Sequence, residues 1–376
     1  MKIFHFSDTH LGITLENTSR EEDFYKNFEF IIYKILELKP DIVIHSGDLF
    51  HTSKPSNKAI SVVVENFLKL EKAGIPVIII AGNHDTPRLT LTTHPFEIFK
   101  SLNNFYVFYE PEIKSLEIYC NDKKSFISTN FIILPHIHDE NIFKEELKKS
   151  NNLILNGKNN IFISHFGISA KKYDEYTDEI SGINIALEDL KILKKFDYVA
   201  LGHYHKQFNI GNITYPGSIE HTSFNQKNYK IGYNIFDTDL KTKESFELQS
   251  RPMIDLGNID CKNIENTANL IEFLEKNINK DSLKNAIVKI ILENLNSKLL
   301  LEFDEKLFLD FFKECFYFEY KKIKFIENRK ISGNIKQDGN TILDNFENFF
   351  DNYNFTNKIE NKDELKKELE ELLKTK

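Results

Sequence analysis

Asp48 follows a short apolar run in this chain, and its carboxylate is the first side chain that could do chemistry. Ile42, Val43 and Ile44 have the β-branched pattern of a buried strand, and Gly47 allows a sharp turn directly after it. Ligands of open α/β sheets bind beyond the carboxyl ends of the strands, where Asp48 is expected. An Asp at such a turn is more often a turn-former than a metal ligand, so Asp48 alone does not define a site.

The same arrangement recurs at four further strand ends. Polar side chains follow or end the apolar runs 2–6, 76–81, 160–165 and 196–202, and they are Asp8, His10, Asn83, His165, His203 and His205. In extended backbone, residues two apart point the same way, so an Asp-x-His or His-x-His pair converges on one point. A single His at a strand end is more often a hydrogen-bonded core residue. Five strand ends with this habit, in a chain with 12 His, favour one common site.

These seven side chains combine carboxylate, amide and imidazole groups without a thiolate. That set suits borderline-hard divalent ions such as Mn²⁺, Fe²⁺ or Zn²⁺. Seven ligands are too many for one tetrahedral ion and suit two ions that share a carboxylate. Two ions roughly 3.5–4 Å apart stabilise both the attacking and the leaving oxygen of a phosphoryl displacement. The sequence therefore predicts phosphoester hydrolysis.

The elements that must position these residues read as an α/β fold. Helical periodicity over about 20–38, and again from Ser53 and Pro55 to Gly74, separates the first three strands, which is typical of a βαβαβ unit with a parallel sheet. Beyond residue 105 the strands are shorter. We expect a hairpin turn at 121–124, a strand at 131–135 and a surface helix over 139–149, with the first domain spanning 1–250.

The remainder of the chain does not carry this signature. Residues 251–332 alternate predicted helices (266–278 and 304–312) with predicted strands (286–292 and 316–325), as expected of a small α+β domain. Residues 333–376 combine a polar tether with two amphipathic stripes. These stripes suit a partner surface, and packing back on their own domain explains them equally well.

Composition limits the class of protein. The 376 residues carry a net charge of −8, which excludes a wholly basic surface but allows a local nucleic-acid patch supported by bound cations. The sequence lacks an apolar run of about 18 residues, so we expect neither a signal peptide nor a membrane span. Three widely spaced cysteines indicate reduced thiols and a cytoplasmic location.

The motifs Asp8-x-His10, Gly47-Asp48, Gly82-Asn83-His84-Asp85, His165 and Gly202-His203-x-His205 resemble, in order and spacing, the calcineurin-like metallophosphoesterase superfamily over about residues 1–220. The resemblance implies mixed sheets packed as a sandwich and flanked by helices. It also implies one ion held by Asp8, His10, Asp48 and His205, and a second held by Asp48, Asn83, His165 and His203. His84 would act on the scissile phosphate without binding metal, and Asp85 would orient its ring.

Flanking residues narrow the resemblance to DNA double-strand-break repair nucleases of the SbcD type. They are Phe6-Ser-Asp-Thr-His-Leu-Gly12, His45-Ser-Gly-Asp-Leu-Phe-His51 and Tyr215-Pro-Gly-Ser218. This implies Mn²⁺, DNA as substrate, and His51 near the substrate phosphate in support of exonuclease activity. It further implies a capping domain over 251–332, a C-terminal helix–loop–helix that binds an SbcC-type coiled-coil ATPase, and a homodimer formed through helices within 54–102. Lys54 and His221 depart from the Arg that members often place there, which weakens the expected phosphate contacts.

Other histidines are expected to lie outside the site. His136-x-His138 has ligand spacing, but it follows Leu134-Pro135 without a neighbouring Gly or Asp. His5, His45 and His94 are expected in the core or at a helix cap.

Two other functions remain open from the sequence. A phosphatase or cyclic-nucleotide phosphodiesterase would use the same chemistry on a smaller substrate, but such enzymes do not need a capping domain or a partner-binding tail. A DNA-end-tethering scaffold with a structural metal site would not need His84, which is not a metal ligand in the superfamily pattern.

Overall fold

The computed structural model describes residues 1–15, 18–88, 93–176, 182–324 and 366. The chain divides into two compact units, residues 1–324 and 325–376, and the elements below belong to the first unit. The predicted tether and helix–loop–helix over 333–376 lie outside the described residues, position 366 apart, as does the end of the predicted capping domain. Among the described helices, none is both long and apolar enough to cross a membrane.

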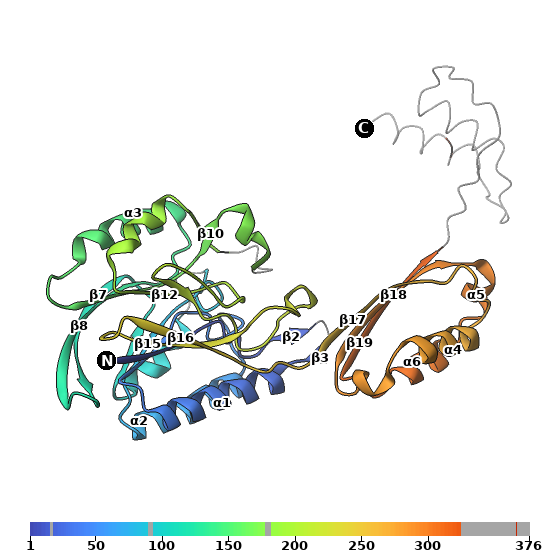
Figure 1. The fold of residues 1–376 in the computed structure, drawn as a ribbon, viewed down its shortest axis with the longest axis horizontal. Coiled ribbons are helices and arrows are strands. Elements are labelled where there is room, and N and C mark those ends of the chain that lie inside the picture. Colours follow the sequence, from blue (N-terminus) through green and yellow to red (C-terminus); the bar gives the residue numbers. More distant parts are fainter. Residues whose placement is uncertain (16–17, 89–92, 177–181, 325–365, 367–376) are drawn as a thin grey trace, which may run out of the picture. The chain divides into compact units, whose positions relative to one another are not determined.

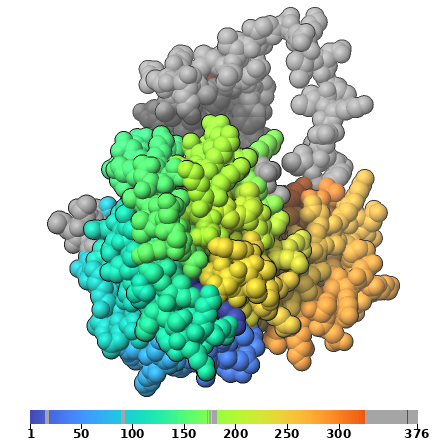
Figure 2. Space-filling view, turned by 60° about the vertical axis from the view of Figure 1, so that its left-hand side comes forward, coloured from blue at the N-terminus to red at the C-terminus, as the bar shows by residue number. Residues whose placement is uncertain are grey.

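A six-stranded sheet is built around the first strand of the chain, in the order β16-β15-β1-β4-β5-β6. Its strands are β1 (Lys2–Phe6), β4 (Ile42–His45), β5 (Val77–Ile80), β6 (Phe105–Phe108), β15 (Gly232–Asp237) and β16 (Thr242–Glu247). The four strands from β1 to β6 are parallel, as the βαβαβ pattern predicted, and β15 joins β1 antiparallel. The blue start of the chain accordingly lies against the yellow segment in Figure 2.

Two helices, α1 (Glu21–Leu38) and α2 (Asn57–Lys72), lie together along this sheet (Figure 1). The apolar residues of α1 recur every three or four positions, so one face is buried while the other stays polar. Ser56 caps α2 by accepting a hydrogen bond from the Ala59 backbone N–H at 3.1 Å. The helix therefore begins later than Ser53 and Pro55 suggested, because the capping hydroxyl belongs to Ser56.

A second six-stranded sheet has the order β13-β14-β12-β9-β8-β7. Its strands are β7 (Glu112–Cys120), β8 (Ser125–Leu134), β9 (Asn159–His165), β12 (Tyr198–Gly202), β13 (Phe208–Ile210) and β14 (Ile213–Tyr215). The hairpin turn predicted at 121–124 joins β7 and β8, and β8 is longer than predicted. Buried apolar residues of both sheets, such as Ile44 and Ile78 from the first and Ile163 from the second, form one core between them. This packing confirms the predicted sandwich.

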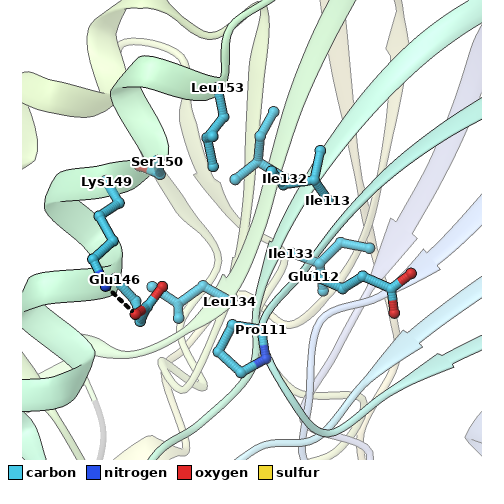
Figure 3. A pocket seen from close by; sticks show the side chains of 10 residues that line it. All are labelled: Pro111, Glu112, Ile113, Ile132, Ile133, Leu134, Glu146, Lys149, Ser150 and Leu153. Carbon is cyan, nitrogen blue, oxygen red and sulfur yellow. Dashed lines mark hydrogen bonds and ion pairs between the residues drawn. The ribbon is translucent and has the colours of Figure 1, made fainter.

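Helix α3 (Glu140–Ser150) covers part of the second sheet and is capped by Asp139, close to the predicted bounds. A cleft of about 510 Å³ separates α3 from the β7–β8 hairpin, and Figure 3 shows its mainly apolar walls and the Lys149–Glu146 ion pair (2.7 Å) at its side. The shorter elements are β2 (Thr14–Leu15), β3 (Thr18–Ser19), β10 (Gly167–Ser169), β11 (Asn184–Ala186), and the 3-10 turns η1 (Pro95–Ser101), η2 (Asn151–Leu153), η3 (Lys171–Tyr176), η4 (Asp189–Lys195), η5 (Phe224–Gln226) and η6 (Lys280–Leu283).

A three-stranded parallel sheet, β17-β18-β19, follows residue 252 and has its own apolar core. Its elements are β17 (Met253–Asp260), α4 (Thr267–Asn277), β18 (Ile287–Leu295), α5 (Ser297–Leu301), α6 (Glu305–Phe311) and β19 (Tyr317–Lys324). Two predicted helices and two predicted strands are found here. Strand β17 was missed, because its half-exposed residues give no apolar run.

Arg251 lies just before β17 and contacts α1 as well as residues that flank β18 and β19. Its guanidinium donates to the Asp23 carboxylate of α1 at 2.8 and 2.6 Å and to the Asn285 backbone oxygen at 2.7 Å. It also stacks on the Phe316 ring, with 3.8 Å between the guanidinium carbon and the ring centroid. A planar, five-donor side chain can make all of these contacts at once, so Arg251 ties the three-stranded sheet to α1.

Candidate metal centre

The predicted ligands lie at the ends of parallel strands of both sheets or in the loops that follow them. Asp8, His10, Asp48 and His203 have positive φ angles of 52°, 40°, 55° and 98°. Non-glycine residues rarely adopt this region, and such strain concentrates at functional sites, where the surrounding structure holds it in place. The backbone therefore turns sharply at four of the seven positions that the sequence singled out.

His10 and His205 face each other at one side of the centre. Their Nε2 atoms are 3.0 Å apart, although the two residues are separated by 195 positions. Asp8 offers a carboxylate oxygen within 4.8 Å of one ring nitrogen of each histidine. The Asp8 carboxylate also accepts a hydrogen bond from the His203 backbone N–H at 2.9 Å, which joins β1 to the loop after β12. These three side chains can hold one cation.

Asn83, His165 and His203 form the other side. The Asn83 Oδ1 atom lies 3.0 Å from His165 Nε2 and 3.3 Å from His203 Nδ1. One amide oxygen and two ring nitrogens are suitable donors for a second cation.

Asp48 stands between the two groups. Its Oδ2 atom lies 3.1 Å from His165 Nε2 in the second group and 3.8 Å from His10 Nε2 in the first. The Asp48 side chain is fully buried, and its Oδ1 atom accepts a hydrogen bond from the His84 backbone N–H at 2.9 Å. A carboxylate in this position can bind two cations at once.

Backbone and side-chain contacts behind the centre orient the ligands. His165 Nδ1 lies 2.9 Å from the Ser46 backbone oxygen, which fixes a proton on Nδ1 and leaves the Nε2 lone pair facing the centre. At Gly47 and Gly202, a Cβ atom would overlap the His165 ring, so both positions require glycine.

His205 is oriented in a way that sequence reasoning missed. Its Nδ1 atom lies 3.2 Å from Thr222 Oγ1 and 3.0 Å from the side-chain amide of buried Gln226. Both residues lie between β14 and β15, Gln226 at the end of η5, where the Tyr215–Ser218 motif and His221 gave the only sequence signals. Thr and Gln in a loop have no periodicity or motif that would have identified them.

The electrostatics of the centre suit cations. Burial raises the pKa of Asp8 to about 6, nearby Asp48 adds to this, and His165 and His205 oppose it. Burial disfavours the charge on His165, yet Asp48 and Asp8 outweigh burial and raise the pKa of His165 to about 10. Two fully buried carboxylates that share one centre need positive charge for compensation, and divalent cations would supply it. The donor set and the charge therefore both fit two metal ions.

His51 and His84 lie beside the first group and are partly exposed. The His84 Nδ1 atom is 2.7 Å from the His51 backbone oxygen, and the two rings stack at 5.2 Å between centroids. The ring of His10 lies 4.8 Å from the ring of His84, and His10 Nδ1 is 3.5 Å from His51 Nδ1. Two imidazoles that are not among the predicted ligands thus lie in contact with the predicted ligand His10.

Asp85 does not orient the ring of His84, and that prediction is wrong. The Asp85 carboxylate is fully buried and accepts backbone hydrogen bonds from Leu49 at 3.1 Å, Phe50 at 2.9 Å and Gly82 at 3.1 Å. These donors lie in the loops after β4 and β5, so Asp85 clamps together the segments that present Asp48 and Asn83. Orientation of His84 comes from the His51 backbone oxygen instead.

The histidines expected outside the site are found in supporting positions. His5 is buried against Tyr198 and Ser46, and His45 contacts Thr9. His94 caps η1 by accepting from the Phe96 backbone N–H.

Comparisons with known proteins agree with this geometry. The calcineurin-like phosphoesterase family model matches residues 1–207. The DNA double-strand break repair protein Mre11 of Methanocaldococcus jannaschii is 32% identical over 72% of this chain and 73% of its own length. Mre11 of Methanococcus maripaludis is 30% identical over 79% of this chain and 75% of its own length. The SbcD component of the SbcCD nuclease of Staphylococcus epidermidis is 30% identical over 64% of this chain and 66% of its own length. As the sequence motifs predicted, the chain belongs to the calcineurin-like metallophosphoesterase family, a family of metal-dependent phosphoesterases, and is similar within it to the Mre11 and SbcD proteins.

Proposed function

We propose that this chain is a Mn²⁺-dependent DNA nuclease of the cytoplasm that processes DNA ends in double-strand-break repair. Its activities would be a 3′→5′ exonuclease on duplex DNA and an endonuclease on single strands. The observation that carries the proposal is the position of Asp48 Oδ2 between two ligand groups, 3.1 Å from His165 Nε2 and 3.8 Å from His10 Nε2. Phosphodiester hydrolysis is the chemistry that two cations joined by one carboxylate would supply.

In this proposal the seven ligands form two groups, according to the distances between their donor atoms. Asp8, His10 and His205 would hold one Mn²⁺ together with Asp48, and Asn83, His165 and His203 would hold the other together with Asp48. The cations would supply positive charge for the phosphate oxygens and for a hydrolytic water. The protein's own contribution is to hold seven donors in place through strained backbone and buried hydrogen bonds.

His84 has the position of a proton donor. The His51 backbone oxygen can only accept, so the His84 Nδ1 atom must carry a proton at their 2.7 Å contact. Its Nε2 atom therefore donates only when the ring is an imidazolium. In that form His84 can stabilise the charge on the phosphate and give a proton to the leaving oxygen. The ring of His51, stacked beside it, would contact the same phosphate.

DNA is proposed as the substrate for two reasons. The similar proteins include a DNA double-strand break repair protein and a component of a nuclease, and the similarity extends over most of the chain. The chain also has a three-stranded domain with its own core after the phosphoesterase sandwich, which we propose as the DNA-binding capping domain (251–332) beside the nuclease domain (1–250). A phosphatase or a cyclic-nucleotide phosphodiesterase would not need it.

A substrate panel tests the proposal. The full chain is incubated with Mn²⁺ or with a chelator and given end-labelled duplex DNA, a cyclic nucleotide and a phosphate monoester. We expect Mn²⁺-dependent shortening of the DNA from its 3′ ends, and a loss of roughly 100-fold or more in His84→Ala with unchanged metal content. Intact DNA together with turnover of a small phosphoester would instead show a small-substrate phosphoesterase. No turnover of any substrate would favour a tethering scaffold.

We further propose that residues 333–376 bind an SbcC-type coiled-coil ATPase. Deletion of 336–376 should then abolish co-purification with that ATPase and leave Mn²⁺-dependent DNA cleavage intact. If the truncated chain still binds the ATPase, this assignment fails.

The nuclease is also proposed to be a homodimer, formed through helices within 54–102. The exposed apolar residues Leu68 on α2 and Ile98 on η1 support this surface. Light scattering should give twice the mass of the 44.1 kDa chain, and the monomer mass would contradict it.

A further inference from the structure

His136 lies directly after strand β8, at the same edge of the second sheet as two proposed ligands. Strands β8, β9 and β12 are parallel neighbours, with Leu134 opposite Ser164 and Gly202 opposite His165. Each of these strands ends in or is closely followed by a histidine, namely His136, His165 and His203. Three adjacent parallel strands therefore deliver an imidazole to one edge of the sheet.

The backbone of His136 also contacts the first sheet. Its N–H donates to the Ala81 backbone oxygen at 3.0 Å, directly after β5 and two residues before Asn83. His136 thus lies where the two sheets meet, on the side of the centre that holds Asn83, His165 and His203.

A chain of hydrogen bonds fixes which ring nitrogen of His136 carries a proton. His138 Nε2 lies 3.3 Å from the Pro87 backbone oxygen, which can only accept, so that nitrogen carries the proton. In the tautomer with this proton, the Nδ1 atom of His138 has a lone pair, and it accepts from His136 Nε2 at 3.3 Å. His136 is left with a lone pair at Nδ1.

This lone pair has no hydrogen-bond donor among the described residues. The Nδ1 atom is buried and without a partner there, and the whole residue is 5% exposed. Burial lowers the pKa of His136 to about 3, with His165 and His138 acting in the same direction and Asp48 opposing them, so the ring stays neutral. A buried acceptor without a donor is unfavourable, and a bound cation would offset this cost.

We propose that His136 is a further nitrogen donor of the metal centre, and that its Nδ1 atom serves the cation held by Asn83, His165 and His203. The inference rests on the two-metal centre of the proposed function. His138 is then a positioning residue, because it selects the tautomer of His136 that can face a cation.

Three substitutions separate a ligand role from a packing role. His136→Leu removes the acceptor and retains an apolar side chain of moderate size. His136→Asn places an amide oxygen near the position of Nδ1. His138→Phe removes the acceptor for the His136 Nε2 proton, so the His136 tautomer is no longer fixed. Binding of Mn²⁺ to each metal-stripped full-length chain is measured by titration calorimetry and by electron paramagnetic resonance, with urea unfolding in parallel.

We expect wild-type protein to bind two Mn²⁺ ions. In His136→Leu, one of the two Mn²⁺ ions should bind about 10- to 100-fold more weakly, while the affinity for the other ion is unchanged. His136→Asn should recover most of this affinity, and His138→Phe should show a smaller loss with the same selectivity. Unchanged affinity for both ions in His136→Leu would overturn the proposal. Equal losses in the Leu and Asn variants, in step with their unfolding free energies, would also overturn it.

A His165→Ala variant in the same series separates this inference from the proposed function. If wild-type protein binds fewer than two ions, or if His165→Ala still binds two, the two-metal centre itself fails. If wild-type protein binds two ions, His165→Ala loses one, and the His136 variants bind Mn²⁺ as tightly as wild type, the two-metal centre stands and His136 is not part of it.

Discussion

Asp85 is the residue on which the loops of the centre depend most directly. Its carboxylate accepts three backbone hydrogen bonds, from Leu49, Phe50 and Gly82, and it is fully buried. Because these donors come from the segments that follow two different strands, the carboxylate fixes the distance between Asp48 and Asn83. Its effect on catalysis would thus pass through metal binding, not through the His84 ring.

Replacement of Asp85 by Asn tests this role. The amide keeps the shape of the carboxylate but presents its NH₂ group to at least one backbone N–H, so we expect a loss of about 3 kcal/mol in the free energy of unfolding. Mn²⁺ content should fall with it. Urea unfolding and metal analysis measure the two effects. A stable variant with full metal content and reduced cleavage would instead favour a direct action of Asp85 on His84.

At the scale of elements, α1 and the loop after β14 meet in a buried ionic network. Glu220 is nearly fully buried and lies 3.3 Å from the Arg20 guanidinium. It also accepts backbone hydrogen bonds from His221 at 2.9 Å and from Arg251 at 3.3 Å. Burial raises the pKa of Glu220 to about 7, Arg20 and the two N–H donors oppose this, and Asp23 adds to it.

This shift makes stability depend on pH. The folded state binds the Glu220 proton more tightly than the unfolded chain, so the stabilisation is present below about pH 4.5 and is lost as the pH rises through about 7. Glu220→Gln removes this contribution. Relative to wild type, its free energy of unfolding should increase by up to about 3 kcal/mol between pH 5 and pH 8. Chemical denaturation across this range measures the difference, and parallel pH profiles would contradict the prediction.

At the scale of the whole molecule, local patterns predicted the strands and the candidate ligands. Runs of β-branched or aromatic residues marked β1, β4 and β5, and each run was followed by a polar cluster that the fold brings into one centre. The sandwich places Asp8 and His205 together across nearly 200 residues, as the recurrence of polar residues at five strand ends favoured and the family resemblance implied. The role of Gln226 was missed because it depends on a tertiary contact: its side-chain amide orients His205.

The His-x-His spacing of His136 and His138 was also less informative about the site than the position of His136 after the end of a strand. His136-x-His138 lacks a neighbouring Gly or Asp, so its sequence context predicted no place in the site. The register of β8 with β9, which pairs Leu134 with Ser164, shows that His136 follows the end of a strand at the edge where His165 lies. A sequence gives the end of a strand, but not which other strands share its edge. Strand β17 was missed for a related reason, since its pairing with β18 compensates for a weak apolar pattern.

Asp48 carries the central claim, because a single buried carboxylate is proposed to join two cations for DNA cleavage. The direct measurement is the number of Mn²⁺ ions per chain, determined by elemental analysis on wild type and on Asp48→Asn, with duplex DNA cleavage followed on the same samples. The account predicts two ions for wild type, fewer than one for the variant, and a fall in cleavage of roughly 100-fold or more. An Asp48→Asn protein that keeps two ions and degrades DNA at the wild-type rate would contradict it.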